Sequence, residues 1–206
     1  YTMYNLVKEI RNKDIDELTT IFTVKLSEMD EQWSGFKSFR LHGQNGRFVK
    51  YLLSRMSAYV DELAGENTNF ATYYHASQGK PFEIEHLWAN NFDKHRDEFE
   101  QLNDFNECRN SIGALVLLPR GTNQSYNDKP YTEKLPHYIK ENLLVKSLHP
   151  LAYDNNPNFK RLLLANQLAF EPHAEMKIKD IQARRALYSQ IAQQIWLLEG
   201  PDHAAV

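Results

Sequence analysis

The 206-residue sequence has little cysteine and few residues that break secondary structure: it contains one cysteine, Cys108, with 8 glycines and 8 prolines. A single thiol excludes an internal disulfide framework and is typical of a chain in a reducing compartment. No stretch approaches the roughly 18 consecutive apolar residues of a membrane span, and the N-terminus lacks the basic and then apolar profile of a signal peptide. The sequence therefore predicts a cytoplasmic protein with no membrane partner.

Neither sign of charge is in large excess, since 24 Lys and Arg stand against 27 Asp and Glu and give a formal net charge of −3. A protein that works mainly by nonspecific attraction to nucleic acid is usually more basic. Any surface that handles phosphate must therefore be a local patch. The basic runs at residues 46–55 and 177–185 are interpreted as solvated helix faces, with contact to a DNA backbone as the alternative.

Most of the chain has apolar residues at helical spacing, and its 12% of aromatic residues are ample for a core. Asp14 is a suitable N-cap for the second helix, and Gly65 stands where the third should end. Helices are predicted at residues 4–10, 14–33, 47–65, 93–110, 128–148, 156–170 and 177–200.

In two short segments the apolar residues follow the pattern of a β-strand instead of helical spacing. Apolar and acidic residues alternate from Phe82 to His86, which is the pattern of a half-buried strand, and the apolar run from Ile112 to Leu118 is bounded by Gly113 and Pro119. The predicted fold is mainly α with a small β-hairpin. A purely helical interaction domain, in which both strand predictions are wrong, is the alternative.

Three polar residues near these strands suggest phosphodiester chemistry. Glu85 and His86 stand side by side at the end of the first strand, and Asn123 follows the second. Hydrolysis of a phosphodiester needs a base to deprotonate water and a divalent cation to stabilise charge on phosphate. His86 could be the base, and the oxygens of Glu85 and Asn123 suit Mg²⁺. Alternatively, His86 is a structural histidine, Glu85 is a surface carboxylate, and Asn123 caps a helix.

The segment IEHLW (residues 84–88), followed by a helix and then by IGALVLLPRGTNQSYNDKPYTEK (residues 112–134), adds specificity. It resembles the HNH (His-Me finger) nuclease domain at the C-terminus of GmrSD-type modification-dependent restriction proteins and of SspE-like defence nucleases. The resemblance implies a ββα-metal core embedded in a helical body. It makes His86 the general base and makes Glu85 and Asn123 ligands of a divalent metal, Mg²⁺ or Mn²⁺.

The resemblance also implies supporting roles. Asn127 and Lys134 match the trailing Asn and Lys positions of the motif, while Arg120 and Lys129, beside the predicted site, are candidate phosphate contacts. The chain departs from the pattern at one position.

Ala114 stands where the family has the Asn that braces the loop of the catalytic His. Asn110, four residues earlier, is the candidate substitute. If the brace is lost, the chain is instead a catalytically degenerate HNH-fold module that binds DNA or a partner.

The sequence is predicted to form an N-terminal helical part (1–78), an HNH nuclease core (79–142) and C-terminal helices of the same domain (143–206). By resemblance it is the DNA-nicking effector of an anti-phage restriction protein. Because the sequence begins at Tyr1, we expect that it was cut from a larger protein and that its partners include an N-terminal sensor/NTPase domain as well as DNA. A single active site acts on one DNA strand, so the sequence leaves open whether the protein forms a homo-oligomer.

Overall fold

The computed structural model describes residues 2–27, 34–75, 81–126, 128–154 and 156–196. The chain divides into two compact units, Tyr1–Gly35 and Phe36–Val206. The first unit contains helices α1 (Thr2–Ile10) and α2 (Ile15–Ser27). Asp14 caps α2 as predicted, because its Oδ1 accepts the backbone N–H of Glu17 at 2.9 Å.

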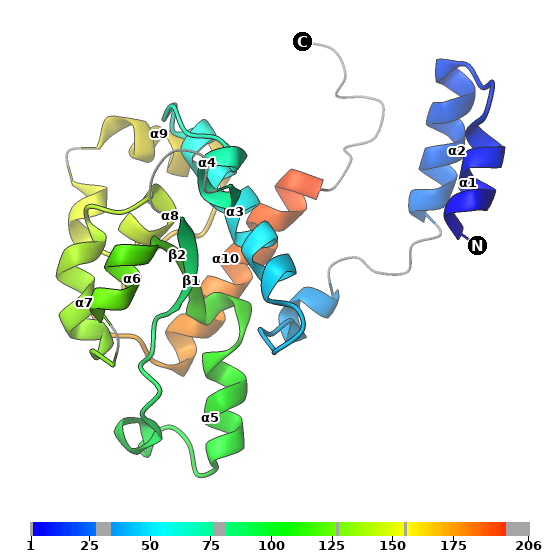
Figure 1. Ribbon diagram of the computed structural model, residues 1–206. Coiled ribbons are helices and arrows are strands. Elements are labelled where there is room, and N and C mark those ends of the chain that lie inside the picture. Colours follow the sequence, from blue (N-terminus) through cyan, green and yellow to red (C-terminus); the bar gives the residue numbers. More distant parts are fainter. Residues whose placement is uncertain (1, 28–33, 76–80, 127, 155, 197–206) are drawn as a thin grey trace. The chain divides into compact units, whose positions relative to one another are not determined.

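The second unit is mainly helical with one small sheet (Figure 1). Its α-helices are α3 (Gly46–Leu63), α4 (Phe70–Tyr74), α5 (Leu102–Arg109), α6 (Arg120–Tyr126), α7 (Tyr131–Tyr138), α8 (Leu143–Lys146), α9 (Pro157–Asn166) and α10 (Ile178–Trp196). Its 3₁₀ helices are η2 (Phe92–His95), η3 (Ile112–Ala114) and η4 (Pro150–Tyr153), and a further one, η1 (Ser34–Ser38), includes residues of both units. In the part of the chain that the structure describes, no helix is long and apolar enough to cross a bilayer.

The sheet consists of two antiparallel strands, β1 (Phe82–His86) and β2 (Leu115–Pro119), which pair from Phe82 opposite Pro119 to His86 opposite Leu115. This hairpin confirms the small β-element predicted from the sequence and excludes the purely helical alternative. The second strand begins three residues later than predicted, because residues 112–114 form η3. There the Gly113 carbonyl accepts a bond from Arg184 of α10 instead of a strand partner.

Two of the predicted helices are each interrupted. The segment predicted at residues 93–110 contains η2 and α5, and the segment predicted at 128–148 contains α7 and α8. The second break has a visible cause at Asn142, whose side chain accepts the backbone N–H of Val145 and donates to the carbonyl of Leu117 at 2.8 Å. Asn142 thus starts a new helix and ties it to β2, an interaction between distant residues that local spacing does not reveal.

Three of the described helices pack against the hairpin. Helix α6 packs on both strands, and α3 and α8 contact β2. Val116 and Leu118 of β2 belong to one hydrophobic core cluster with Tyr126, Tyr131, Leu135 and Tyr138 of α6 and α7. Since alternate strand residues share a face, the register places Glu83 and Glu85 of β1 on the α6–α7 side with these two residues. The predicted boundaries at residues 78 and 142 stay a prediction.

We expect Gly113→Ala to destabilise the second unit by about 1–3 kcal/mol, the usual cost of overpacking. A Cβ at Gly113 would press on the carbonyl oxygen of Ile181 and lie 2.7 Å from the backbone nitrogen of Arg185, so α10 would have to move away from η3. Urea unfolding checks this result, with Gly43→Ala as the control, because nothing lies within 4 Å of that Cβ. Equal stability of the two variants would contradict the close contact between η3 and α10.

Candidate active site

The imidazole of His86 is fixed at the end of β1. Its Nε2 lies 2.9 Å from Oδ1 of Asn110, and Asn110 is itself held because its Nδ2 donates to the Asn106 carbonyl at 2.8 Å. Since an amide oxygen only accepts, the neutral ring carries its proton on Nε2 and leaves Nδ1 as the basic nitrogen. Burial, and next the charge of Arg109, lower the pKa of His86 to about 4. The ring is therefore neutral at neutral pH.

The carboxylate of Glu85 forms a buried ion pair with Lys134 of α7. Nζ of Lys134 lies 2.5 Å from Oε1 of Glu85 and also donates to the His86 carbonyl at 2.9 Å. Glu85 is 8% exposed and Lys134 is 1% exposed. Burial raises the pKa of the Glu85 carboxyl, and the positive charges of Lys134 and Arg109 oppose that rise. One ammonium group thus fixes both residues at the end of β1.

Asn123 lies inside α6, three residues after its start, so it does not cap that helix as the alternative interpretation held. Its Nδ2 donates to Oε2 of Glu83 at 3.3 Å, and Nε of Arg120 lies 3.4 Å from Oε1 of the same carboxylate. The structure therefore pairs Asn123 with Glu83, whereas we expected it beside Glu85. The alternation of residues in β1 could have indicated Glu83 as the partner of Asn123, because Glu83 and Glu85 share one strand face.

Of the two remaining sequence candidates, the structure describes only Lys129. Lys129 is exposed after α6, where its backbone N–H donates to the Tyr126 carbonyl. Asn127 lies outside the described residues. The structure thus gathers Glu85, His86, Asn110 and Lys134 into one connected cluster, while Arg120 and Asn123 meet at Glu83. Asn110, Lys134 and Glu83 come from three separate elements.

The donor atoms at this site suit a hard divalent cation better than zinc. Among the described residues, no group of three or more His, Cys, Asp and Glu side chains could hold a metal, so a closed zinc centre is not formed there. Carboxylate oxygens of Glu85 and the amide oxygen of Asn123 are the ligands that Mg²⁺ takes, and Mg²⁺ keeps several waters. Oε1 of Glu85, however, already receives the Lys134 ammonium.

Ala114 is fully buried in the core cluster beside this site. From the sequence alone, Ala114→Asn restores the bracing Asn of the family and is predicted to raise activity, or to leave it unchanged, if there is room for the larger side chain. The structure revises that expectation, because Asn110 already contacts His86 and the carbonyl of Ala114 accepts the Leu87 N–H at 2.9 Å.

We now expect Ala114→Asn to lower the free energy of unfolding by about 1–3 kcal/mol without raising activity, since it adds volume and a buried polar group. Thermal unfolding and a plasmid-nicking assay measure the two effects. Higher activity with unchanged stability would show that the lost brace limits catalysis.

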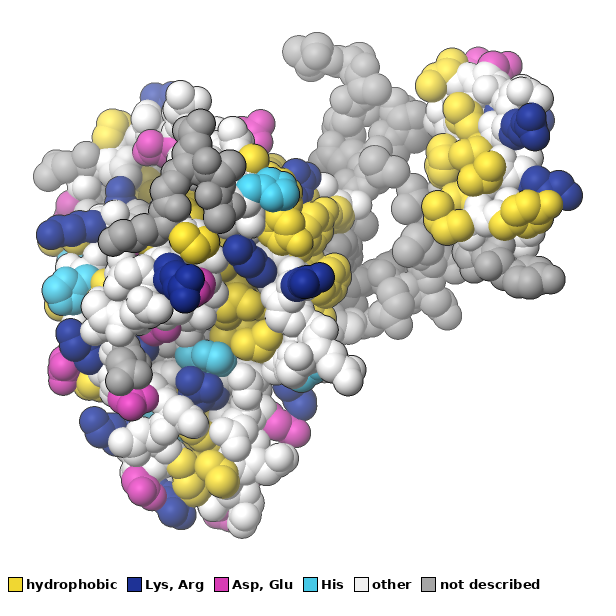
Figure 2. All heavy atoms as spheres, in the orientation of Figure 1, with side chains coloured by type: hydrophobic (Ala, Val, Ile, Leu, Met, Phe, Trp, Pro, Cys, Tyr) yellow, Lys and Arg dark blue, Asp and Glu magenta, His cyan; other side chains and the backbone are white. Residues whose placement is uncertain are grey.

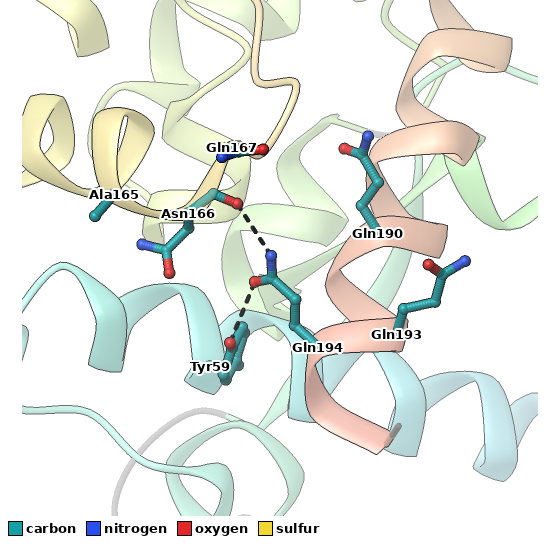
Figure 3. Close-up of a pocket in the computed structure, with 7 residues that line it drawn as sticks. All are labelled: Tyr59, Ala165, Asn166, Gln167, Gln190, Gln193 and Gln194. Atoms are coloured by element: carbon teal, nitrogen blue, oxygen red, sulfur yellow. Dashed lines mark hydrogen bonds between the residues drawn. The ribbon is translucent and has the colours of Figure 1, made fainter. Parts of the chain in front are cut away.

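A separate hollow of about 520 Å³ lies between α9, α10 and Tyr59 of α3 (Figure 3). Gln194 spans it, with Nε2 donating to the Asn166 carbonyl and Oε1 accepting from Tyr59. Its other lining residues are Ala165, Gln167, Gln190 and Gln193. These side chains are neutral and include no nucleophile activated by a base, so the hollow offers no hydrolytic chemistry.

Comparison with known proteins identifies the family of the chain. A family model described as the C-terminal domain of GmrSD restriction endonucleases matches residues 25–188. That range includes β1, β2 and the whole cluster around His86. Searches of curated proteins and of solved structures found no significant match.

Proposed function

Because the chain belongs to the family of GmrSD restriction endonuclease C-terminal domains, we propose that it is a metal-dependent HNH endonuclease domain that nicks DNA. The observation that carries the proposal is the neutral, braced imidazole of His86 next to a buried carboxylate at the end of β1. We infer that β1, β2 and the following helix α6 form the ββα core of the site. This is the element order that a His-Me finger nuclease requires.

In the proposed reaction, Nδ1 of His86 accepts a proton from the attacking water. Asn110 holds the ring by Nε2, and Lys134 fixes the backbone at the His86 carbonyl, so the basic nitrogen keeps one direction. Glu85 and Asn123 would hold the divalent cation, with Glu83 as a further oxygen donor. When bound, that cation supplies positive charge to the phosphate and the leaving oxygen.

We propose that two cations, Arg120 and Lys129, position DNA and take no part in the reaction. Arg120 is more than half exposed and makes a long contact with Glu83, so its guanidinium is accessible to a phosphate. Lys129 is exposed a few residues further along the chain. A phosphate contact from either side chain would fix the register of the strand without reading its sequence.

We also propose that the domain is the effector part of an anti-phage restriction protein, joined to an N-terminal part that senses modification and hydrolyses nucleotide. One His86 site cleaves one strand, so double-strand cleavage would need a homo-oligomer or a second visit.

Incubation of supercoiled plasmid with the purified protein and Mg²⁺ or Mn²⁺ tests the activity. We expect conversion to the open-circular form, which EDTA abolishes. Binding of DNA without any cleavage, across both metals and in purified full-length protein, would instead support the catalytically degenerate module. Cleavage that survives EDTA would contradict the metal dependence.

A further inference from the structure

Helices α3 and α4, together with Phe39 directly after η1, carry a surface on which aromatic rings alternate with cations. We call it the aromatic–basic strip, and its members are Phe39, Phe48, Tyr51, Phe70 and Tyr74 with Arg47, Lys50 and Arg55. The rings form a continuous chain: Phe39 and Phe48 are 5.7 Å apart between centroids, Phe48 and Tyr51 are 6.4 Å apart, and Tyr51 and Phe70 are 5.4 Å apart. Such a row of rings is a substantial apolar surface outside the core cluster.

Phe48 is 52% exposed on α3. The other rings of the strip are partly exposed. Single exposed apolar side chains are common on soluble proteins, but a contiguous exposed set marks an interaction site. The strip is therefore suited to bind a ligand with flat apolar faces.

The cations of the strip indicate that this ligand is negatively charged. Lys50 lies 5.8 Å from the ring of Tyr74, and Arg55 lies 5.7 Å from the ring of Phe70. Within the described parts of the chain, neither of them nor Arg47 forms an ion pair, and Nε of Arg55 is buried without a hydrogen-bond acceptor. From Trp33 to Val60 the sequence contains no Asp or Glu, although the whole protein is acidic.

The two ends of the strip lie near the two ends of β1, and one of them is close to the candidate active site. Next to Phe39, the backbone N–H of Leu41 donates to the carbonyl of Asn110 at 2.8 Å, and the side chain of Asn110 holds His86. At the other end, Tyr73 of α4 packs on Phe82, the first residue of β1, with centroids 4.9 Å apart. Figure 2 shows hydrophobic and cationic side chains gathered over α3, on the face where β1 is seen in Figure 1.

We propose that the aromatic–basic strip binds unpaired bases of single-stranded DNA and leads that strand past His86. Bases stack on aromatic side chains while Lys and Arg contact the backbone, and this combination is how single strands are bound without regard to sequence. In a duplex the base faces are already stacked on one another, so the rings favour unpaired DNA. This inference rests on the proposed nuclease function and names its substrate class, DNA with a single-stranded segment at the cleavage site.

Fluorescence anisotropy with labelled oligo-dT and with a duplex of equal length tests the strip, using the full chain. We expect the intact protein to bind oligo-dT more tightly than duplex. Phe48→Ala should weaken oligo-dT binding roughly 5- to 150-fold, the range for loss of one stacked base, with little change for duplex. Leu164→Ala is the matched control, because it removes an exposed apolar side chain, 85% exposed, from α9.

Lys50→Ala tests the charged half of the strip. It should lower the salt dependence of oligo-dT binding by about 0.7 in the slope of log K against log salt, the value for one phosphate contact on a single strand. Lys160→Ala, an exposed lysine of α9, should leave the slope unchanged. Equal effects of the paired variants, or binding that favours duplex, would overturn the inference. Concentration-dependent self-association that Phe48→Ala abolishes, without oligo-dT binding, would assign the strip to a second copy of the chain and overturn it too.

The proposed function and the strip can fail separately. Oligo-dT binding that depends on Phe48, in a protein that cleaves no DNA with Mg²⁺ or Mn²⁺, would overturn the nuclease and leave the binding surface standing. Cleavage of a bubble-containing duplex at the same rate by wild type and Phe48→Ala, together with equal oligo-dT affinity, would overturn the strip and leave the nuclease standing.

Discussion

His86→Ala should lower the rate of metal-dependent plasmid nicking by at least roughly 10²-fold, and up to about 10⁴-fold, because a positioned general base contributes that much. The fold should be unaffected, since the ring contacts Asn110 at the end of β1 and is only partly buried. The rate of nicking under single-turnover conditions is the measurement. His137→Ala is the control, because that histidine is exposed on α7.

A His86→Ala variant that keeps near wild-type nicking would exclude His86 as the base. Circular dichroism and thermal unfolding of both variants separate a lost base from a lost fold. If His86→Ala also unfolds at lower temperature than His137→Ala, the effect on rate is read instead from His86→Gln, which keeps a side chain able to donate to Oδ1 of Asn110.

The sequence predicted the elements that local pattern determines. The alternation in residues 82–86 gives β1, Asp14 caps α2, and Gly65, with its φ of +74°, follows the end of α3 where a left-handed residue is needed. The pattern did not predict where helices break. The start of α8 depends on Asn142 bonding to Leu117, and η3 depends on Arg184 of α10 bonding to Gly113. These contacts join residues far apart in the sequence.

The candidate site divides in the same way. Glu85 and His86 are neighbours in the sequence, so their joint place at the end of β1 could be predicted from it. The contact of Lys134 with both of them joins α7 to β1 and was not predicted, since the resemblance implied only a supporting role for Lys134. The pairing of Asn123 with Glu83 was missed, because the choice between two carboxylates on one strand face is made by the position of α6. The catalytic roles of all these residues stay predictions.

Lys134→Met should lower the free energy of unfolding by about 3–5 kcal/mol, the usual cost of removing one partner from a buried ion pair. Methionine fills a similar volume, but it leaves the Glu85 carboxylate without its ammonium partner and the His86 carbonyl without that donor. Urea unfolding at neutral pH measures the loss. Lys177→Met is the matched control: Lys177 pairs with Asp97 in an exposed ion pair 2.7 Å long, and such pairs contribute about 1 kcal/mol or less.

The double variant Glu85→Gln with Lys134→Met separates the ion pair from the packing around it. Because replacing both partners removes the uncompensated buried charge, we expect it to be more stable than Lys134→Met alone, with a coupling energy of about 1–3 kcal/mol in the double-mutant cycle. A coupling energy near zero would mean that Glu85 does not depend on Lys134 for its charge. A loss in Lys134→Met no larger than in Lys177→Met would show that the pair is solvated, and β1 would then need another anchor at its end.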